Sequence, residues 1–145
     1  MTVWFDMDGT IADLYGVDNW LEQIKTDNEK PFVIAKPLVD TTALEELMNG
    51  IQRKGHKIGI VTCLVGGATK NFNKKVIKAK KNWLEQNLKN VKFDKIVFLE
   101  YEDVKNQVND GTDILFDDED RHLEKWTGKA VKACYMMETM TKIVG

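Results

Sequence analysis

Short apolar segments alternate along the chain with segments in which apolar residues recur every three or four positions. The apolar segments predict strands at Thr2 to Phe5, Lys57 to Val61, Lys95 to Leu99, Asp113 to Phe116 and Ala130 to Tyr135. The first, second and fourth are nearly continuous apolar runs, which is typical of strands buried on both faces. The periodic segments between them predict helices at Thr41 to Arg53, Asn73 to Leu88, Glu102 to Val108 and Glu119 to Trp126.

Strands that alternate with helices predict an α/β fold with a parallel sheet and right-handed crossovers. We expect a Rossmann-like three-layer sandwich whose five parallel strands lie in the order 3-2-1-4-5, which makes the first and fourth strands neighbours. A chain of 145 residues, 43% of them hydrophobic, suits one domain with its own core. Residues 1–145 are therefore expected to form a single domain.

One connection is much longer than the others. Between the first strand and the helix at Thr41 the chain is far longer than the roughly two to six residues usual for such a loop. It contains an amphipathic stretch, Val17 to Ile24, and both prolines, Pro31 and Pro37. Long loops after a strand of an α/β sheet are usually functional. We expect residues 14–40 to form a reduced cap over the carboxyl ends of the strands, where such sheets bind ligands.

Acidic residues stand directly after two of the predicted strands. Asp6 and Asp8 follow the first strand, where Gly9 permits a tight turn, and Asp117 follows the fourth. Because these strands are expected to be neighbours, the three carboxylates would meet at one edge of the sheet. Hard oxygen ligands in that arrangement suit Mg²⁺. The alternative is a polar turn with solvated aspartates.

Two further polar features adjoin these strand ends. Asp118 or Glu119 is able to cap the following helix, which explains part of the acidic run but not Asp117. Thr62 and Cys63 follow the second strand, on the other side of the first. The Thr62 hydroxyl is able to hydrogen-bond a phosphate oxygen, although threonine is common in strands. The position of Thr62 beside the acidic strand ends is what supports a phosphate-binding role.

These residues resemble the motifs of the haloacid dehalogenase-like phosphohydrolase superfamily. The segment 6–10 matches the first motif, Thr62 the second, and Asp117 with Asp118 the fourth. The resemblance implies that Asp6 attacks phosphorus and that Asp8 acts as general acid and then as general base. It implies that Thr62, with Cys63 beside it, binds the phosphoryl group. Mg²⁺ would be held by Asp6, the backbone carbonyl of Asp8 and Asp117, with Asp118 supporting the metal site.

The third motif of the superfamily is a lysine, and two lysines compete for it. Lys105 lies before the fourth strand, where that lysine often occurs. Lys80 shares a helix face with Val76 and Trp83 at about 100° per residue, and a lysine on an apolar face requires an anion or a route to water. Lys105 is favoured for the motif, and Lys80 is expected to bind the same phosphate from another side.

Within the superfamily the chain looks most like the 5'(3')-deoxyribonucleotidases and their small bacterial and phage relatives, over the segments 6–13, 80–85 and 114–118. The expected substrate is therefore a small phosphorylated molecule, a nucleotide. The cap residues Tyr15, Trp20 and Phe32 would stack on its base, unless they form the cap's own core. A less favoured substrate is a nucleic-acid end or another large molecule, and a third reading is a non-catalytic binding module.

Charge and cysteine content restrict the other possibilities. The formal net charge of −2 argues against wrapping of nucleic acid but not against a local basic patch. Cys63 and Cys134 follow no metal or disulfide spacing, so reduced cysteines and a cytoplasmic location are expected. No apolar run approaches the roughly 20 residues of a membrane span, and no signal peptide or membrane partner is expected.

Overall fold

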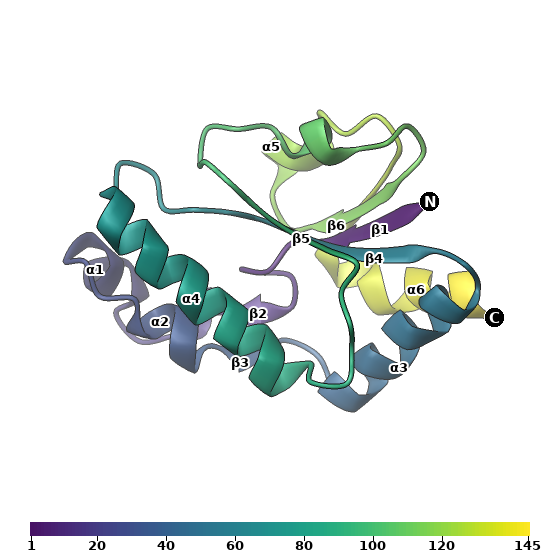
Figure 1. The fold of residues 1–145 in the computed structure, drawn as a ribbon, viewed down its shortest axis with the longest axis horizontal. Helices are drawn as coiled ribbons and strands as arrows, with labels where there is room; N and C mark the ends of the chain where they lie inside the picture. The colour runs from purple at the N-terminus through teal and green to yellow at the C-terminus, as the bar shows by residue number, and fades with distance from the viewer.

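The computed structural model describes residues 1–145 and has a five-stranded parallel sheet at its centre (Figure 1). Its strands are β1 (Thr2–Phe5), β4 (Lys57–Cys63), β5 (Lys95–Leu99), β6 (Ile114–Asp117) and β7 (Lys129–Lys132). They lie in the order β5-β4-β1-β6-β7, and every pair is parallel. In chain order this is 3-2-1-4-5, so the predicted α/β fold and strand order are confirmed.

Helices cover both faces of the sheet. On one face lie α3 (Thr41–Arg53), α4 (Lys70–Asn87) and α6 (Met136–Val144), and on the other lie α5 (Asp120–Leu123) and the 3₁₀ helix η2 (Lys105–Val108) (Figure 1). Alternate strand residues divide between the two cores. Val3 and Phe5 pack with α3, α4 and α6, whereas Trp4 packs with Trp126 on the opposite face. The sheet is therefore buried on both sides, as the continuous apolar strands predict.

Several predicted boundaries are corrected by the structure. The second strand continues to Cys63, and the fifth ends at Lys132, where the chain turns into the 3₁₀ helix η3 (Ala133–Tyr135). The helices predicted at 102–108 and 119–126 are shorter, as η2 and α5. Helix α4 begins at Lys70 because Thr69 caps it, with its hydroxyl accepting a hydrogen bond from the Phe72 amide at 3.1 Å.

The long segment after β1 folds into small elements of its own. It contains the 3₁₀ helix η1 (Leu14–Gly16), α1 (Trp20–Lys25) and α2 (Lys30–Ile34), and it is closed by the antiparallel pair β2 (Ala12–Asp13) and β3 (Lys36–Pro37). Three apolar residues of this segment share a core with three residues of α4, namely Leu14, Ile24 and Phe32 with Phe72, Val76 and Ala79. The segment is thus fastened to the sheet through α4. No helix of the protein combines the length and the apolar character that a bilayer span requires.

Asp113 ties the start of β6 to the start of β1. This buried carboxylate accepts hydrogen bonds from the Thr2 amide at 2.8 Å, the Trp4 indole at 3.1 Å and the Asp110 amide at 3.0 Å. Burial by itself would raise the pKa of Asp113, but these hydrogen bonds outweigh it and hold that pKa below its ordinary value. The ionised carboxylate therefore stabilises the pairing of the two central strands.

Asp113→Asn is expected to lower the free energy of unfolding by about 1–3 kcal/mol, because an accepting oxygen becomes a donating amide. Urea unfolding at pH 7 measures the loss, and the exposed Asp110→Asn is the matched control. The difference from wild type should shrink as the pH falls below about 4, because protonation then removes the same interactions from the wild type. Equal stability of Asp113→Asn and wild type at pH 7 would contradict this role.

Candidate active site

A cavity of about 310 Å³ lies at the carboxyl ends of the central strands. Asp6 and Asp8 line it from the end of β1, and Cys63 lines it from the end of β4. The segment after β1 contributes apolar walls, including Tyr15 and Trp20. This is the edge at which open α/β sheets bind ligands, so the cavity is the candidate active site.

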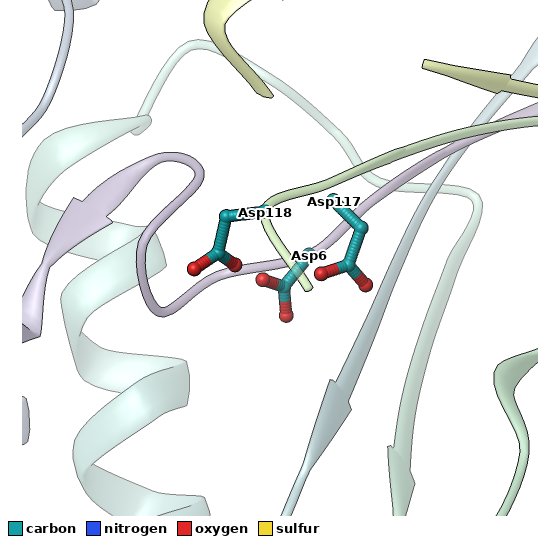
Figure 2. A group of neighbouring side chains, drawn as sticks. All are labelled: Asp6, Asp117 and Asp118. Carbon is teal, nitrogen blue, oxygen red and sulfur yellow. The ribbon is translucent and has the colours of Figure 1, made fainter. Parts of the chain in front are cut away.

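Three aspartates meet at the strand ends beside the cavity, and one of them, Asp6, lines it. Asp6, Asp117 and Asp118 each place a carboxylate oxygen within 4.8 Å of the others, and the three side chains converge in Figure 2. Burial and the Asp6 carboxylate raise the pKa of Asp117 to about 6 and that of Asp118 to about 8. The carboxylates are crowded enough that a proton or another cation is favoured among them.

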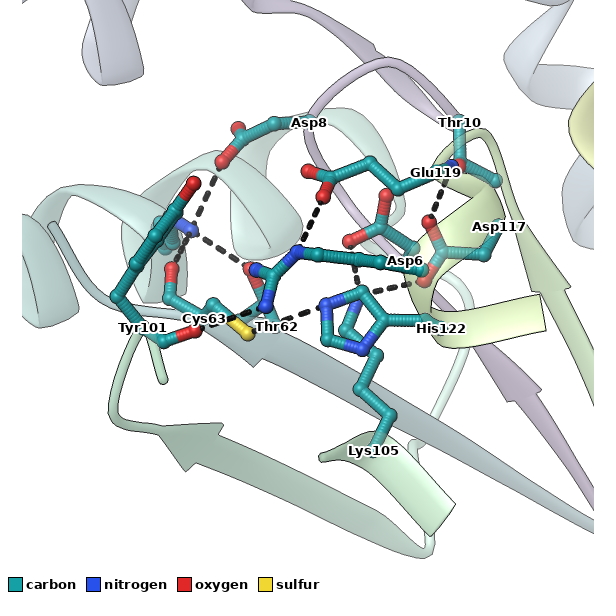
Figure 3. Close-up of polar contacts among 12 residues, drawn as sticks. Asp6, Asp8, Thr10, Thr62, Cys63, Tyr101, Lys105, Asp117, Glu119 and His122 are labelled. Carbon is teal, nitrogen blue, oxygen red and sulfur yellow. Dashed lines mark hydrogen bonds and ion pairs between the residues drawn. The ribbon is translucent and has the colours of Figure 1, made fainter. Parts of the chain in front are cut away.

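Lys105 neutralises part of this charge. Its ammonium donates to Asp6 Oδ1 and to Asp117 Oδ2, both at 2.7 Å (Figure 3). Burial by itself would lower the pKa of Lys105, but the two carboxylates raise it above its ordinary value. The second oxygen of Asp6 accepts from the Thr10 hydroxyl at 3.0 Å. Both oxygens of Asp6 are therefore held, and the charge of Lys105 keeps the pKa of Asp6 low despite its burial.

Lys80 forms a second buried pair on the other side of the strand end. Its ammonium donates to Asp8 Oδ2 at 2.9 Å, to Thr62 Oγ1 at 2.6 Å and to the Cys63 carbonyl at 3.0 Å. Burial raises the pKa of Asp8 above its ordinary value, and the charge of Lys80 opposes that rise. The structure thus brings both rival lysines to the predicted aspartates, with Lys105 at Asp6 and Lys80 at Asp8.

Gly9 makes possible the tight turn that follows Asp6 and Asp8. Its backbone is left-handed, with φ of 83°, and a β-carbon there would collide with the Asp118 carboxylate and approach Tyr15 to 2.9 Å. The turn is closed by hydrogen bonds from the amides of Thr10, Ile11 and Ala12 to the Met7 carbonyl. A side chain at position 9 would therefore displace the acidic cluster as well as strain the turn.

The aromatic residues predicted for the cap separate into two roles. Tyr15 and Trp20 form an edge-to-face pair with ring centroids 5.0 Å apart, and both line the cavity. Phe32 also lines the cavity but belongs to the apolar core shared with α4, and its ring lies 5.2 Å from the Lys80 ammonium. Of these three residues, Tyr15 and Trp20 are therefore available to a ligand, whereas Phe32 mainly packs the cap.

The sequence did not predict a cluster in which Arg121 joins Glu119 to Tyr101. Arg121 donates to Glu119 at 2.8 Å and to the Tyr101 carbonyl at 3.0 Å, and its guanidinium lies 4.5 Å from the centroid of the Tyr101 ring (Figure 3). All three residues line the cavity. Arg121 shares α5 with no apolar stripe, and Tyr101 lies in a distant loop, so no periodicity or spacing connects them. Only the placement of Arg121 four residues beyond Asp117 was available as a signal.

His122 is the other residue that the sequence did not single out. It is buried, and its Nε2 lies 3.8 Å from the Cys63 thiol. Burial and the charges of Lys105 and Arg121 lower the pKa of His122 to about 4, so its imidazole is neutral at pH 7. Burial also raises the pKa of the Cys63 thiol. Cys63 therefore lines the cavity with an un-ionised thiol, and its backbone carbonyl accepts a hydrogen bond from Lys80.

The donor set at the acidic end fits a hard divalent cation. Asp118 Oδ1 is buried and has no hydrogen-bond partner within the protein, and a bound cation would compensate for this. The carboxylates of Asp6, Asp117 and Asp118 supply oxygen ligands only, which favours Mg²⁺ over zinc. Two ammonium groups, Lys80 and Lys105, lie among the four carboxyl groups at positions 6, 8, 117 and 118, and the raised pKa of Asp118 shows that the cluster favours a further cation, which is either a proton or a metal ion.

Comparison of the sequence with known proteins does not assign the chain to a family. A scan against models of protein families finds no match, and a search of curated proteins finds none either. The resemblance to the haloacid dehalogenase-like superfamily therefore stays a prediction from the motif residues.

Lys80→Met is expected to lower the free energy of unfolding by about 1–3 kcal/mol, because Asp8 loses its counter-charge and buried acceptors lose their donor. Lys78→Met removes the same charge from the exposed side of α4 and should change stability by less than about 0.5 kcal/mol. Urea unfolding of the two variants beside wild type measures both effects. Indistinguishable stabilities of the two variants would show that Lys80 is not a paired, buried cation.

Proposed function

We propose that the protein is a Mg²⁺-dependent phosphomonoester hydrolase that passes through an aspartyl-phosphate on Asp6. The observation that supports this most strongly is the arrangement at the end of β1, where Asp6 and Asp8 each pair with their own buried lysine. One carboxylate is held ionised by Lys105, and the other has a raised pKa. Such a division between two neighbouring carboxyl groups suits a nucleophile beside a general acid.

In the proposed first step, an Asp6 carboxylate oxygen attacks phosphorus and forms a new P–O bond. The bond between phosphorus and the ester oxygen breaks, and the leaving oxygen takes a proton from Asp8. In the second step Asp8, now a carboxylate, accepts a proton from water as the water oxygen attacks phosphorus. The P–O bond to Asp6 breaks, which releases inorganic phosphate and restores both carboxyl groups. Splitting the hydrolysis in this way replaces one difficult step with two easier ones.

The remaining polar groups would bind and position the phosphoryl group. Lys105 and Lys80 place positive charge on either side of Asp6 and Asp8, and the Thr62 hydroxyl lies 2.6 Å from the Lys80 ammonium. Positive charge and hydrogen-bond donors at these positions stabilise the charge that redistributes during transfer. Mg²⁺, held by Asp6, Asp117 and the Asp8 backbone carbonyl with Asp118 in support, would neutralise further charge on the transferring group.

A nucleotide is the substrate that the cavity suits best. The cavity volume of about 310 Å³ is that of a small-molecule site, and the Tyr15–Trp20 pair offers an aromatic wall close to the carboxylates. A non-catalytic binding module on the same fold would need neither ionised Asp6 nor a general acid beside it. The cytoplasmic location expected from the cysteines, both of which are free in the structure, stays a prediction.

Asp6→Asn is expected to lower kcat by more than about 1000-fold with any accepted phosphomonoester, because an amide is a poor nucleophile. A panel of mononucleotides and other small phosphomonoesters, assayed for released phosphate, identifies the substrate and measures the loss. The exposed Asp18→Asn in the cap is the matched control and should keep wild-type activity. Retention of more than a few per cent of activity by Asp6→Asn would rule out the aspartyl-phosphate.

Removal of divalent cations is expected to abolish activity, and Mg²⁺ should restore it better than Zn²⁺. A second measurement needs no turnover, because Mg²⁺ at about 100 times its Kd should stabilise the fold by roughly 2.7 kcal/mol. Asp117→Asn should lose most of this Mg²⁺-dependent increase in Tm, whereas Asp120→Asn, in the same acidic run, should keep it. Full activity after chelation and exhaustive dialysis would contradict the metal requirement.

A further inference from the structure

Helix α4 carries a row of unpaired lysines on its outer side. Its exposed lysines are Lys70, Lys74, Lys75, Lys78 and Lys81, which we call the lysine stripe. At about 100° per residue, four of them fall within an arc of about 80°, and Lys75 lies next to it. Residues 70–84 contain no acidic residue, and none of the five lysines forms an ion pair. In a chain of net charge −2, this is a local concentration of positive charge.

Repulsion among the lysines of the stripe destabilises helix α4. Lys70 and Lys74 are four residues apart, as are Lys74 and Lys78, and like charges at this spacing destabilise a helix by roughly 0.2–0.5 kcal/mol per pair. No carboxylate offsets that repulsion within the stripe. The opposite face of the helix contains the buried Lys80, which reaches Asp8. One helix therefore supplies a cation to the site on its inner side and a row of cations to solvent on its outer side.

The beginning of the stripe is fixed to the rim of the cavity. Asn73, in the first turn of α4, accepts a hydrogen bond from the Val65 amide at 3.0 Å and donates one to the Val65 carbonyl at 3.1 Å. Val65 and its neighbours Leu64 and Gly66 line the cavity. The exposed lysines then follow one another along α4, whose course Figure 1 shows. Lys70 to Lys81 span about 16 Å at about 1.5 Å per residue.

We propose that the lysine stripe binds the phosphate backbone of a nucleic-acid strand whose terminal phosphate lies in the cavity. The placement of the terminal phosphate rests on the proposed phosphohydrolase function, whereas binding of the strand by the stripe does not. A row of cations that leads away from a phosphate site is complementary to a polymer with regularly spaced phosphates. The terminal nucleotide would occupy the cavity, and the next phosphates would lie along α4.

The residues beside the lysines favour a nucleic-acid strand over a lipid surface as the partner of the lysine stripe. The exposed residues between its lysines are polar, Asn71 and Asn82, and no large apolar side chain is exposed on α4. A helix that binds in a membrane interface presents apolar side chains beside its cations. An acidic protein would satisfy the charge but would not link the stripe to the phosphate site.

The test compares two triple variants of equal charge. Lys70→Gln, Lys74→Gln and Lys78→Gln together neutralise the stripe, and Gln keeps the helix propensity of Lys. Lys54→Gln, Lys57→Gln and Lys129→Gln together remove the same charge around the amino ends of the strands, opposite the cavity. Both triples are made in wild type and in Asp6→Asn, and circular dichroism checks that each protein folds.

Binding is measured first, by fluorescence anisotropy of a short single strand with a terminal phosphate, in the Asp6→Asn background. We expect the stripe triple to weaken binding at least about 10-fold and to reduce the slope of log Kd against log salt by about 2, since each phosphate contact contributes roughly 0.7. The opposite-face triple should weaken binding by less than about 2-fold. Equal losses in the two triples, or no binding by the parent protein, would overturn the proposal. So would equal competition from anionic vesicles or an acidic peptide.

Turnover is measured second, in the wild-type background, with 5'- and 3'-phosphorylated oligonucleotides and a mononucleotide. The stripe triple should lower kcat/KM for the preferred oligonucleotide at least about 10-fold and leave the mononucleotide value unchanged. A parallel fall for both substrates would overturn the role of the stripe. If neither substrate is hydrolysed by any protein, the phosphohydrolase proposal fails, while the anisotropy result still decides whether the stripe binds a strand.

Discussion

The pairing of two buried lysines with two strand-end carboxylates is the interaction on which the candidate site depends. Lys105 and Lys80 are almost fully buried, and an ammonium group without a partner at such a depth would be strongly unfavourable. Asp6, Asp8 and Asp117 supply the partners, and they are in reach only because β1 lies between β4 and β6. The lysine–carboxylate pairs therefore depend on the strand order and on the turn at Gly9. Each buried lysine in turn depends on its pair for a counter-charge.

Much of the fold was accessible from the sequence because strand burial and helix amphipathicity leave periodic patterns. The predicted bounds of Thr2–Phe5, Lys95–Leu99 and Thr41–Arg53 agree with β1, β5 and α3. The inward position of Lys80 was also predictable, since a wheel places it among apolar residues that pack against the cap and sheet. Helix α6 was not predicted. Its apolar residues, Met136 and Met140, continue a strand-like segment without a turn signal, and they become helical by packing on α3.

The polar partners in the site were harder to predict, because they depend on three-dimensional contacts between loops. Strand order brings Asp6 beside Asp117, and this neighbourhood could be deduced. The stack of Arg121 on Tyr101 joins the loop after β5 to α5, and no local pattern specifies it. The same holds for the contact between His122 and Cys63. Sequence patterns thus indicated which strand ends carry the polar side chains of the candidate site, whereas the residues that form its walls are brought together only by the three-dimensional fold.

Direct detection of the phosphorylated enzyme tests the central claim, that Asp6 becomes covalently bound to phosphorus. An accepted phosphomonoester is mixed with Asp8→Asn protein and Mg²⁺, the reaction is quenched in acid within milliseconds to seconds, and the peptides are analysed by mass spectrometry. The phosphomonoester is chosen with a leaving group that needs no protonation, so that loss of the general acid spares the first step. Loss of the general base still slows the second step, so the intermediate should accumulate. The account predicts one added phosphoryl group on the peptide that contains Asp6, at the Asp6 side chain. Turnover by the wild type with no phosphorylated peptide in either protein, or with the phosphoryl group on another residue, would contradict it.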